Sequence, residues 1–274
     1  MDPAGMVRAS SLAVVAWVDG GGAPRATGVV ALTRGPVPVL ALTFARADLA
    51  RTLAGQGAEP STGQVALVLT ETRSTGAGFV PRVLHATTRL EVDLSGDLYR
   101  GELIVQELHR YPPSRLLADS PLLCREHWWY LPRLVLELPD PEVSDLPVGT
   151  DGSARQVLVT VDGDRPSISL ARLSGQDGPG ERPGLELLGG ADPVPGPALV
   201  FGQDASFPDL ERWEEWSWAG RVERSGAGWT LAVAQAPDRV GLPGVRRLLG
   251  RWQAHRRLER ACRQGLGGWS RPAP

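Results

Sequence analysis

The chain has 274 residues, of which 42% are hydrophobic and 22% are charged, and its formal net charge at pH 7 is −2. This composition is typical of a globular protein and excludes a disordered or fibrous chain. The small net charge also argues against a protein whose whole surface is basic and binds nucleic acid. A content of 33 glycines and 24 prolines favours many short strands with tight turns over a bundle of long helices.

The residue types that are missing exclude several kinds of site. All 29 basic residues are arginines, and asparagine is absent as well. A lysine Schiff base, a phosphate-binding lysine of the Walker type and N-glycosylation are therefore excluded. The two cysteines, Cys124 and Cys262, are far apart in the sequence. This spacing argues against a disulfide scaffold or a structural zinc site and favours a cytoplasmic location.

The first half of the chain predicts a series of short strands and helices. An apolar run at residues 12–18 is ended by Asp19 and three glycines, so we expect a buried strand there and not a signal peptide. Together with the apolar run at residues 27–32 it predicts a β-hairpin. Residues 64–70 predict a strand that is buried on both faces. The other elements expected here are strands at 38–44, 82–92 and 128–138, and helices at 45–54, 97–109 and 114–118.

The second half begins with a change in composition. Residues 141–155 are rich in proline, glycine and acidic residues, which predicts a linker between a first domain at 10–140 and a second, β-rich unit at 156–274. Residues 157–163 (VLVTVDG) echo residues 14–20 (VVAWVDG). This echo supports the hypothesis that the second unit is a degenerate copy of the first.

The last element expected is a helix of about six turns at residues 243–265. One face of it is apolar and the other carries seven arginines. We interpret it as a solvated helix whose arginines pair with Glu211, Glu214 and Glu215, because no second basic patch supports a nucleic-acid site. No segment approaches the roughly 18 to 20 apolar residues of a membrane span. The sequence therefore predicts neither a nucleic acid nor a membrane as a partner.

The order of these elements resembles the FMN-binding split β-barrel of the pyridoxamine 5′-phosphate oxidase-like family, a group of flavin and deazaflavin oxidoreductases. The resemblance covers about residues 10–140. It is carried by the opening hairpin, by residues 43–53 running into the strand at 64–69, by the crossing strand at 82–91 and by the closing strand at 130–137. It implies a mainly β fold with peripheral helices: a split β-barrel, here followed by the second, degenerate unit and the C-terminal helix.

The resemblance also implies a cofactor whose phosphate lies at a strand-to-helix turn, where helix N–H groups and basic or hydroxyl side chains stabilise a dianion. The residues that it assigns are Thr43, Arg46 and Arg51 to the phosphate, and Arg25, Thr27 and His85 toward the ring. The sequence departs from the family at Asp48-Leu49, where an arginine-lysine pair is common. Because a carboxylate repels a phosphate, this departure favours a chain that has lost FMN.

Residues 125–130 (REHWWY) form the most unusual stretch of the chain. Trp128 could stack on a flavin, a deazaflavin or a porphyrin, with His127 as a ligand or an acid. The alternative, which we favour, is that the paired tryptophans close a hydrophobic core. Trp128 is kept as a candidate cofactor-binding residue, and neither a catalytic residue nor a metal site is predicted.

These observations lead to three hypotheses of different classes. The first is a flavin- or deazaflavin-dependent oxidoreductase of unknown substrate, in which the cofactor performs the chemistry. The alternative is a non-catalytic protein on the same fold that has lost FMN and binds another cofactor or haem. The third is a regulatory protein that contacts a partner through its C-terminal helix. The expected partner is a small molecule, and the expected assembly is a homodimer or an internally paired monomer.

Overall fold

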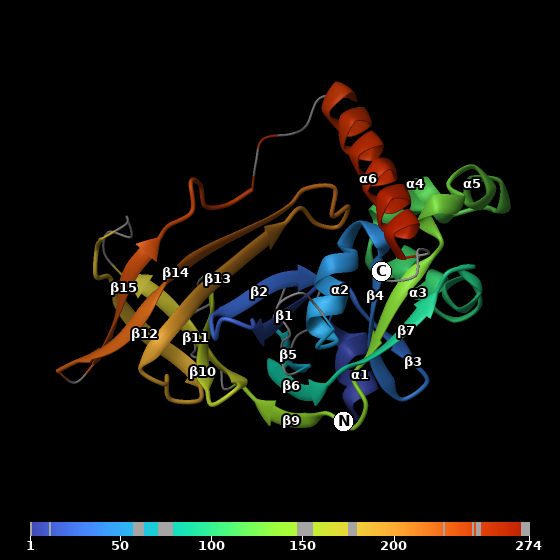
Figure 1. Ribbon diagram of the computed structural model, residues 1–274. Helices are drawn as coiled ribbons and strands as arrows, with labels where there is room; N and C mark the ends of the chain where they lie inside the picture. The colour runs from blue at the N-terminus through green and yellow to red at the C-terminus, as the bar shows by residue number, and fades with distance from the viewer. Residues whose placement is uncertain are drawn as a thin grey trace.

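The computed structural model describes residues 2–10, 12–56, 63–70, 79–146, 156–174, 180–226, 228–242, 244 and 248–269. Within these residues the chain is mainly β with a long C-terminal helix, as the sequence predicts. The strands of the first half form two sheets, and those of the second half form a closed six-stranded barrel (Figure 1).

The first sheet contains the predicted opening hairpin. Its strands, in the order β2-β1-β5-β6-β9, are β2 (Pro24–Val29), β1 (Ala13–Val18), β5 (Gln64–Leu69), β6 (Arg82–Thr87) and β9 (Glu142–Asp145). The hairpin turn forms because the Asp19 carboxylate accepts hydrogen bonds from the backbone N–H groups of Gly21 and Ala23, at 3.0 and 2.9 Å. Gly22 supplies the positive φ of 78° that this turn requires.

The second sheet has the order β3-β4-β8-β7, with strands β3 (Ala31–Arg34), β4 (Val37–Thr43), β8 (Arg133–Glu137) and β7 (Arg89–Asp93). Both sheets contribute to one core, to which β1 and β5 give Val15 and Leu67 while β4 and β8 give Leu40 and Leu134. Two sheets around a shared core are the arrangement that the resemblance to a split barrel implies.

Two strand predictions need correction. The single strand expected at 82–92 is two strands, β6 and β7, which separate at Thr88 and join different sheets. The break is fixed by the Thr88 hydroxyl, which donates to the backbone carbonyl of Leu53 at 2.6 Å. The strand expected from residue 128 begins only at Arg133, because Pro132 has no N–H to give to a ladder. Residues before it form a 3₁₀ turn, η4 (Trp128–Tyr130).

Short helices cover the first unit. They are α1 (Pro3–Ala9), η1 (Phe44–Arg46), α2 (Ala47–Leu53), the π-helical turn η2 (Tyr99–Leu103), α3 (Ile104–Arg110), η3 (Pro112–Ser114), α4 (Arg115–Ala118) and α5 (Pro121–Glu126). The helix predicted at 97–109 is therefore η2 followed by α3. Its start is fixed by the Asp93 carboxylate, which accepts from the backbone N–H groups of Asp97 and Tyr99 at 3.0 and 2.9 Å.

The second half forms a barrel of six antiparallel strands in the order β10-β11-β12-β15-β14-β13, closed by the pairing of β13 with β10. The strands are β10 (Gln156–Asp162), β11 (Arg165–Ser174), β12 (Gly184–Gly190), β13 (Gly196–Ala205), β14 (Trp213–Ser225) and β15 (Gly228–Gln235). Apolar side chains such as Leu158, Val200, Trp218 and Leu231 fill its interior.

The barrel packs on the outer face of the first sheet. Alternate residues of β1 enter different cores: Val15 faces the core of the first unit, whereas Val14 faces β10, β11 and β13 of the barrel. In β5, Leu67 and Val68 divide in the same way. The prediction that this strand is buried on both faces is thus confirmed, and the barrel supplies the second cover.

The C-terminal helix α6 (Leu248–Trp269) returns to the first unit (Figure 1), where it packs against η1 and η4. The helix continues past its predicted end at residue 265, as far as residue 269. Its predicted start, at residue 243, lies partly outside the described residues. Gly265 allows the close approach, since a Cβ there would collide with the backbone carbonyl of Phe44. No described helix is long and apolar enough to cross a membrane.

Candidate functional site

The structure brings two of the predicted cofactor residues together, Thr27 of β2 and Arg46 of η1. The Arg46 guanidinium donates from Nη2 to the Thr27 hydroxyl at 2.8 Å and from Nη1 to the Gly28 carbonyl at 3.2 Å. The Thr27 hydroxyl in turn donates to Oε2 of Glu215, on barrel strand β14, at 2.8 Å. A carboxylate of the second unit therefore lies beside Thr27, a residue that the resemblance assigns to the cofactor ring.

The barrel also closes the space around this pair. A Cβ at Gly28 would collide with the side chains of Gln203 and Trp213, which lie on β13 and β14. These two side chains are held together by a 3.2 Å hydrogen bond from Nε1 of Trp213 to Oε1 of Gln203. The hairpin surface beside Thr27 is consequently covered by ordered side chains of the same chain.

Helix α6 covers the other two residues that the resemblance assigns to the phosphate. The Thr43 side chain lies beside the thiol of Cys262, a buried group whose pKa is raised by that burial. The Arg51 guanidinium lies over the ring of Trp269, 4.1 Å from its centroid, and forms an ion pair with Asp48 at 3.2 Å. Both polar groups are therefore engaged within the chain.

The remaining two residues assigned to the ring lie in separate ion-pair environments. Nε of Arg25 donates to Asp19 at 2.7 Å, at the hairpin turn. His85 lies on β6 opposite Glu142 of β9, and burial lowers the pKa of its imidazole, with the charge of Arg165 acting in the same direction. Among the described residues, neither Arg25 nor His85 is hydrogen-bonded to Thr27 or Arg46.

These surroundings do not fit a bound flavin. A flavin there would have to displace Glu215 from Thr27, Trp213 from beside Gly28 and Cys262 from beside Thr43. The assignment of these residues to a cofactor stays a prediction, and their geometry gives no support for FMN.

The two tryptophans of the REHWWY stretch have different surroundings. Trp129 is 1% exposed and packs in the core under the helices, as expected for the pair, whereas Trp128 is 51% exposed. Trp128 lies beside a groove of about 900 Å³ between α3, α5, η4 and the end of α6. The groove lining is mostly apolar, and its charged and thiol side chains are Arg100, Asp119, Cys124 and Arg125.

A histidine pair joins this region to α6. The ring of His127 lies 5.2 Å from that of His255, and both rings pack edge-on against Trp129. Nδ1 of His127 is 3.2 Å from the carbonyl of Leu117 and therefore donates to it, since a carbonyl only accepts. Burial, reinforced by His127, lowers the pKa of His255. No local motif points to His255, which lies among arginines in the sequence.

Sequence reasoning also missed a buried polar cluster around Arg133. Its guanidinium is fully buried between the rings of Tyr99 and Tyr130, 3.7 and 4.2 Å from their centroids. Glu107 of α3 provides the counter-charge at 3.5 Å and accepts hydrogen bonds from Tyr130 and Ser114 at 2.5 and 2.7 Å. Within the described residues, no group of three or more His, Cys, Asp or Glu side chains is placed to hold a metal ion.

No protein-family model and no curated protein match the chain. Similar solved structures include HutZ, the haem storage protein of Vibrio cholerae, with 14% identity over 52% of this chain and 89% of that one and a TM-score of 0.34. A haem binding protein of Mycobacterium smegmatis has 12% identity over 96% of this chain and 99% of that one, with a TM-score of 0.30. Likenesses this low carry no argument about the activity of this chain.

Proposed function

We propose that this chain is a non-catalytic binding protein for a flat, largely apolar molecule that carries carboxylates, a tetrapyrrole such as haem being the class that fits. The proposed site is the groove between α3, α5, η4 and the end of α6. The observation that carries the proposal is the half-exposed Trp128 at an apolar groove that also contains two arginines.

The groove lining matches the chemistry of such a ligand. Apolar walls formed by Ile104, Leu108 and Leu266 would cover a ring system, on which an indole can stack. Arginine is suited to carboxylates because its guanidinium forms two parallel hydrogen bonds with them. Arg100 is already paired with Asp97, whereas Arg125 has no acidic partner among the described residues. Arg125 is therefore the better carboxylate-binding residue.

Cys124 is the lining residue that could hold a haem iron, since a cysteine thiolate is an established class of haem ligand. Its thiol donates a weak hydrogen bond to the Ala118 carbonyl at 3.5 Å. His127, the ligand that the sequence suggests, packs against His255 and does not line the groove. The filling of the predicted flavin region by Glu215 and Trp213 supports a binding protein over a flavin oxidoreductase.

Titration of the purified chain with haemin, followed by the Soret band, tests the proposal. We expect saturation at one haemin per chain. Trp128→Ala and Arg125→Ala should each weaken binding about tenfold, because an aromatic contact or a charged hydrogen bond contributes about 1 to 2 kcal/mol. Cys124→Ala should shift the position of the Soret band if the thiol binds iron.

The control is Arg224→Ala, which removes an exposed arginine that lies over Trp229 on the barrel, 5.7 Å from that ring. Haemin binding by this variant should equal that of the unaltered chain. A parallel titration with FMN should show no stoichiometric binding. Stoichiometric binding of FMN without haemin, or Soret titrations that Trp128→Ala and Arg125→Ala leave unchanged, would overturn the proposal.

A further inference from the structure

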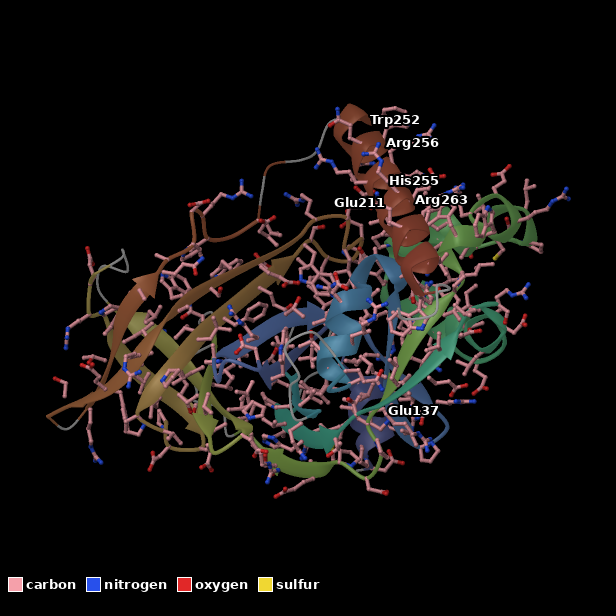
Figure 2. The ribbon with its side chains drawn as sticks, viewed as in Figure 1. Glu137, Glu211, Trp252, His255, Arg256 and Arg263 are labelled. Carbon is pink, nitrogen blue, oxygen red and sulfur yellow. The ribbon has the colours of Figure 1, made fainter. Side chains whose placement is uncertain are left out.

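An exposed stripe of arginine and tryptophan runs along α6. Trp252, Arg256, Arg260 and Arg263 follow one another at spacings of four, four and three residues, which places them on one side of the helix. Figure 2 shows Trp252 and Arg256 near the beginning of α6 and Arg263 nearer its end. The Arg256 guanidinium lies 5.4 Å from the Trp252 ring centroid, and that of Arg263 lies 5.1 Å from Trp128. The stripe spans about 16 Å.

The stripe is positively charged although the whole chain is slightly acidic. Glu259 is the only acidic residue of α6, and it is shared between Arg256 and Arg263 at 3.5 and 2.9 Å. Arg251 is paired with Glu211 at 2.5 Å, a contact of the kind that the sequence analysis expects. Among the described residues, Arg257 and Arg260 have no acidic partner. A polar hollow of about 540 Å³ lies among Arg256, Arg260 and Arg263.

Exposed apolar side chains lie on the neighbouring helices. Five of the ten exposed large hydrophobic side chains recorded in the described residues belong to the helical elements from α3 to α6: Val105, Leu116, Leu122, Trp128 and Trp252. Figure 1 shows these helices together, at the end of the molecule away from the barrel. Exposed apolar side chains gathered at one end of a molecule mark an interaction surface.

We propose that this helical end docks on the surface of a bilayer that contains anionic lipids. Arg256 and Arg260 would bind lipid phosphates, while Trp252 and the exposed leucines would enter the interfacial layer. Leucine side chains gain nothing from a nucleic acid, whose surface is charged and polar, so the mixture of arginine, tryptophan and leucine favours a bilayer. The inference revises the expectation of no membrane partner, and the variants that test it change no residue that lines the groove.

Vesicle flotation of the ligand-free chain tests this surface. The chain should float with vesicles of 70% phosphatidylcholine and 30% phosphatidylglycerol, and should float much less with phosphatidylcholine alone or at high salt. Arg256→Glu combined with Arg260→Glu should weaken binding at least about twentyfold, because each arginine near an anionic surface contributes about fivefold. Trp252→Ala should weaken it less.

The matched control is Arg221→Glu combined with Arg224→Glu, which reverses two exposed charges on barrel strand β14 and changes the net charge equally. This control should float like the unaltered chain. Circular dichroism and thermal unfolding would confirm that all variants are folded. Equal flotation of the α6 variant and the control would overturn the proposal, as would binding to a single-stranded oligonucleotide with no binding to vesicles.

Discussion

Arg133 places a positive charge in the interior of the first unit, where an ionised group is stable only with partners. The carboxylate of Glu107 balances this charge at 3.5 Å, and the rings of Tyr99 and Tyr130 cover the two sides of the guanidinium. Burial raises the pKa of both phenols, so they remain neutral. Because these residues come from η2, α3, η4 and β8, the cluster joins four elements of the first unit.

Removal of the counter-charge should therefore be costly. Glu107→Ala leaves Arg133 charged and unpaired in the interior, and we expect a loss of about 3 to 5 kcal/mol in the free energy of unfolding, measured with urea. The control is Glu223→Ala, which breaks an exposed ion pair with Arg182 and should cost less than about 1 kcal/mol. Equal losses of unfolding free energy in the two variants would mean that the buried pair stabilises the fold no more than an exposed one.

Single residues also show what the sequence could and could not predict. The turn at Asp19 was predictable because its hydrogen bonds are local. Trp128 and Trp129 are adjacent and identical, and only the 3₁₀ turn before Pro132 separates them into an exposed and a buried side chain. The contact between Thr27 and Glu215 joins residues 188 positions apart. No local pattern encodes such a pair.

At the scale of elements, α6 illustrates the same limit. Its amphipathic pattern predicts a helix, but its docking on η1 depends on Gly265, which approaches the backbone of Phe44, and on the edge-to-face contact of Phe44 with Trp269 at 5.9 Å. In the sequence, Gly265 is one of three glycines that suggest the end of a helix, and the prediction indeed ends there. The packing, not the local propensity, keeps residues 265–269 helical.

Gly265→Ala should loosen this helix. The added Cβ collides with a backbone carbonyl that cannot move aside. We therefore expect the free energy of unfolding to fall by about 1 to 3 kcal/mol. Gly267→Ala is the matched control, because nothing lies within 4 Å of its added Cβ and alanine favours a helix by up to about 1 kcal/mol. The stability of both variants is measured by thermal unfolding, and the docking of α6 by the rate at which trypsin cleaves within it. Faster cleavage in Gly267→Ala than in Gly265→Ala would contradict the packing argument.

At the scale of the whole molecule, the barrel takes the role of a cover for the first unit. The outward side chains of β1, β5 and β6 are apolar, including Val14, Val68 and Val83, and they form one core with β10, β11 and β13. The chain thus provides both sides of this interface. The same packing brings Glu215 and Trp213 onto β2, so the cover and the filling of the predicted flavin region are one structural feature.

This arrangement makes β2 sensitive to a single methyl group. In Gly28→Ala the added Cβ meets Oε1 of Gln203 and the ring of Trp213, and moving either side chain aside breaks the hydrogen bond that joins them. We expect the free energy of unfolding, measured with urea, to fall by about 1 to 3 kcal/mol. Because the units share a core, the loss should lower the midpoint of one common transition. Gly101→Ala, with no atom within 4 Å of its Cβ, is the control. If Gly28→Ala instead showed two separate unfolding transitions, the two units would unfold independently. The shared core would then not be the interaction that holds the barrel against β2.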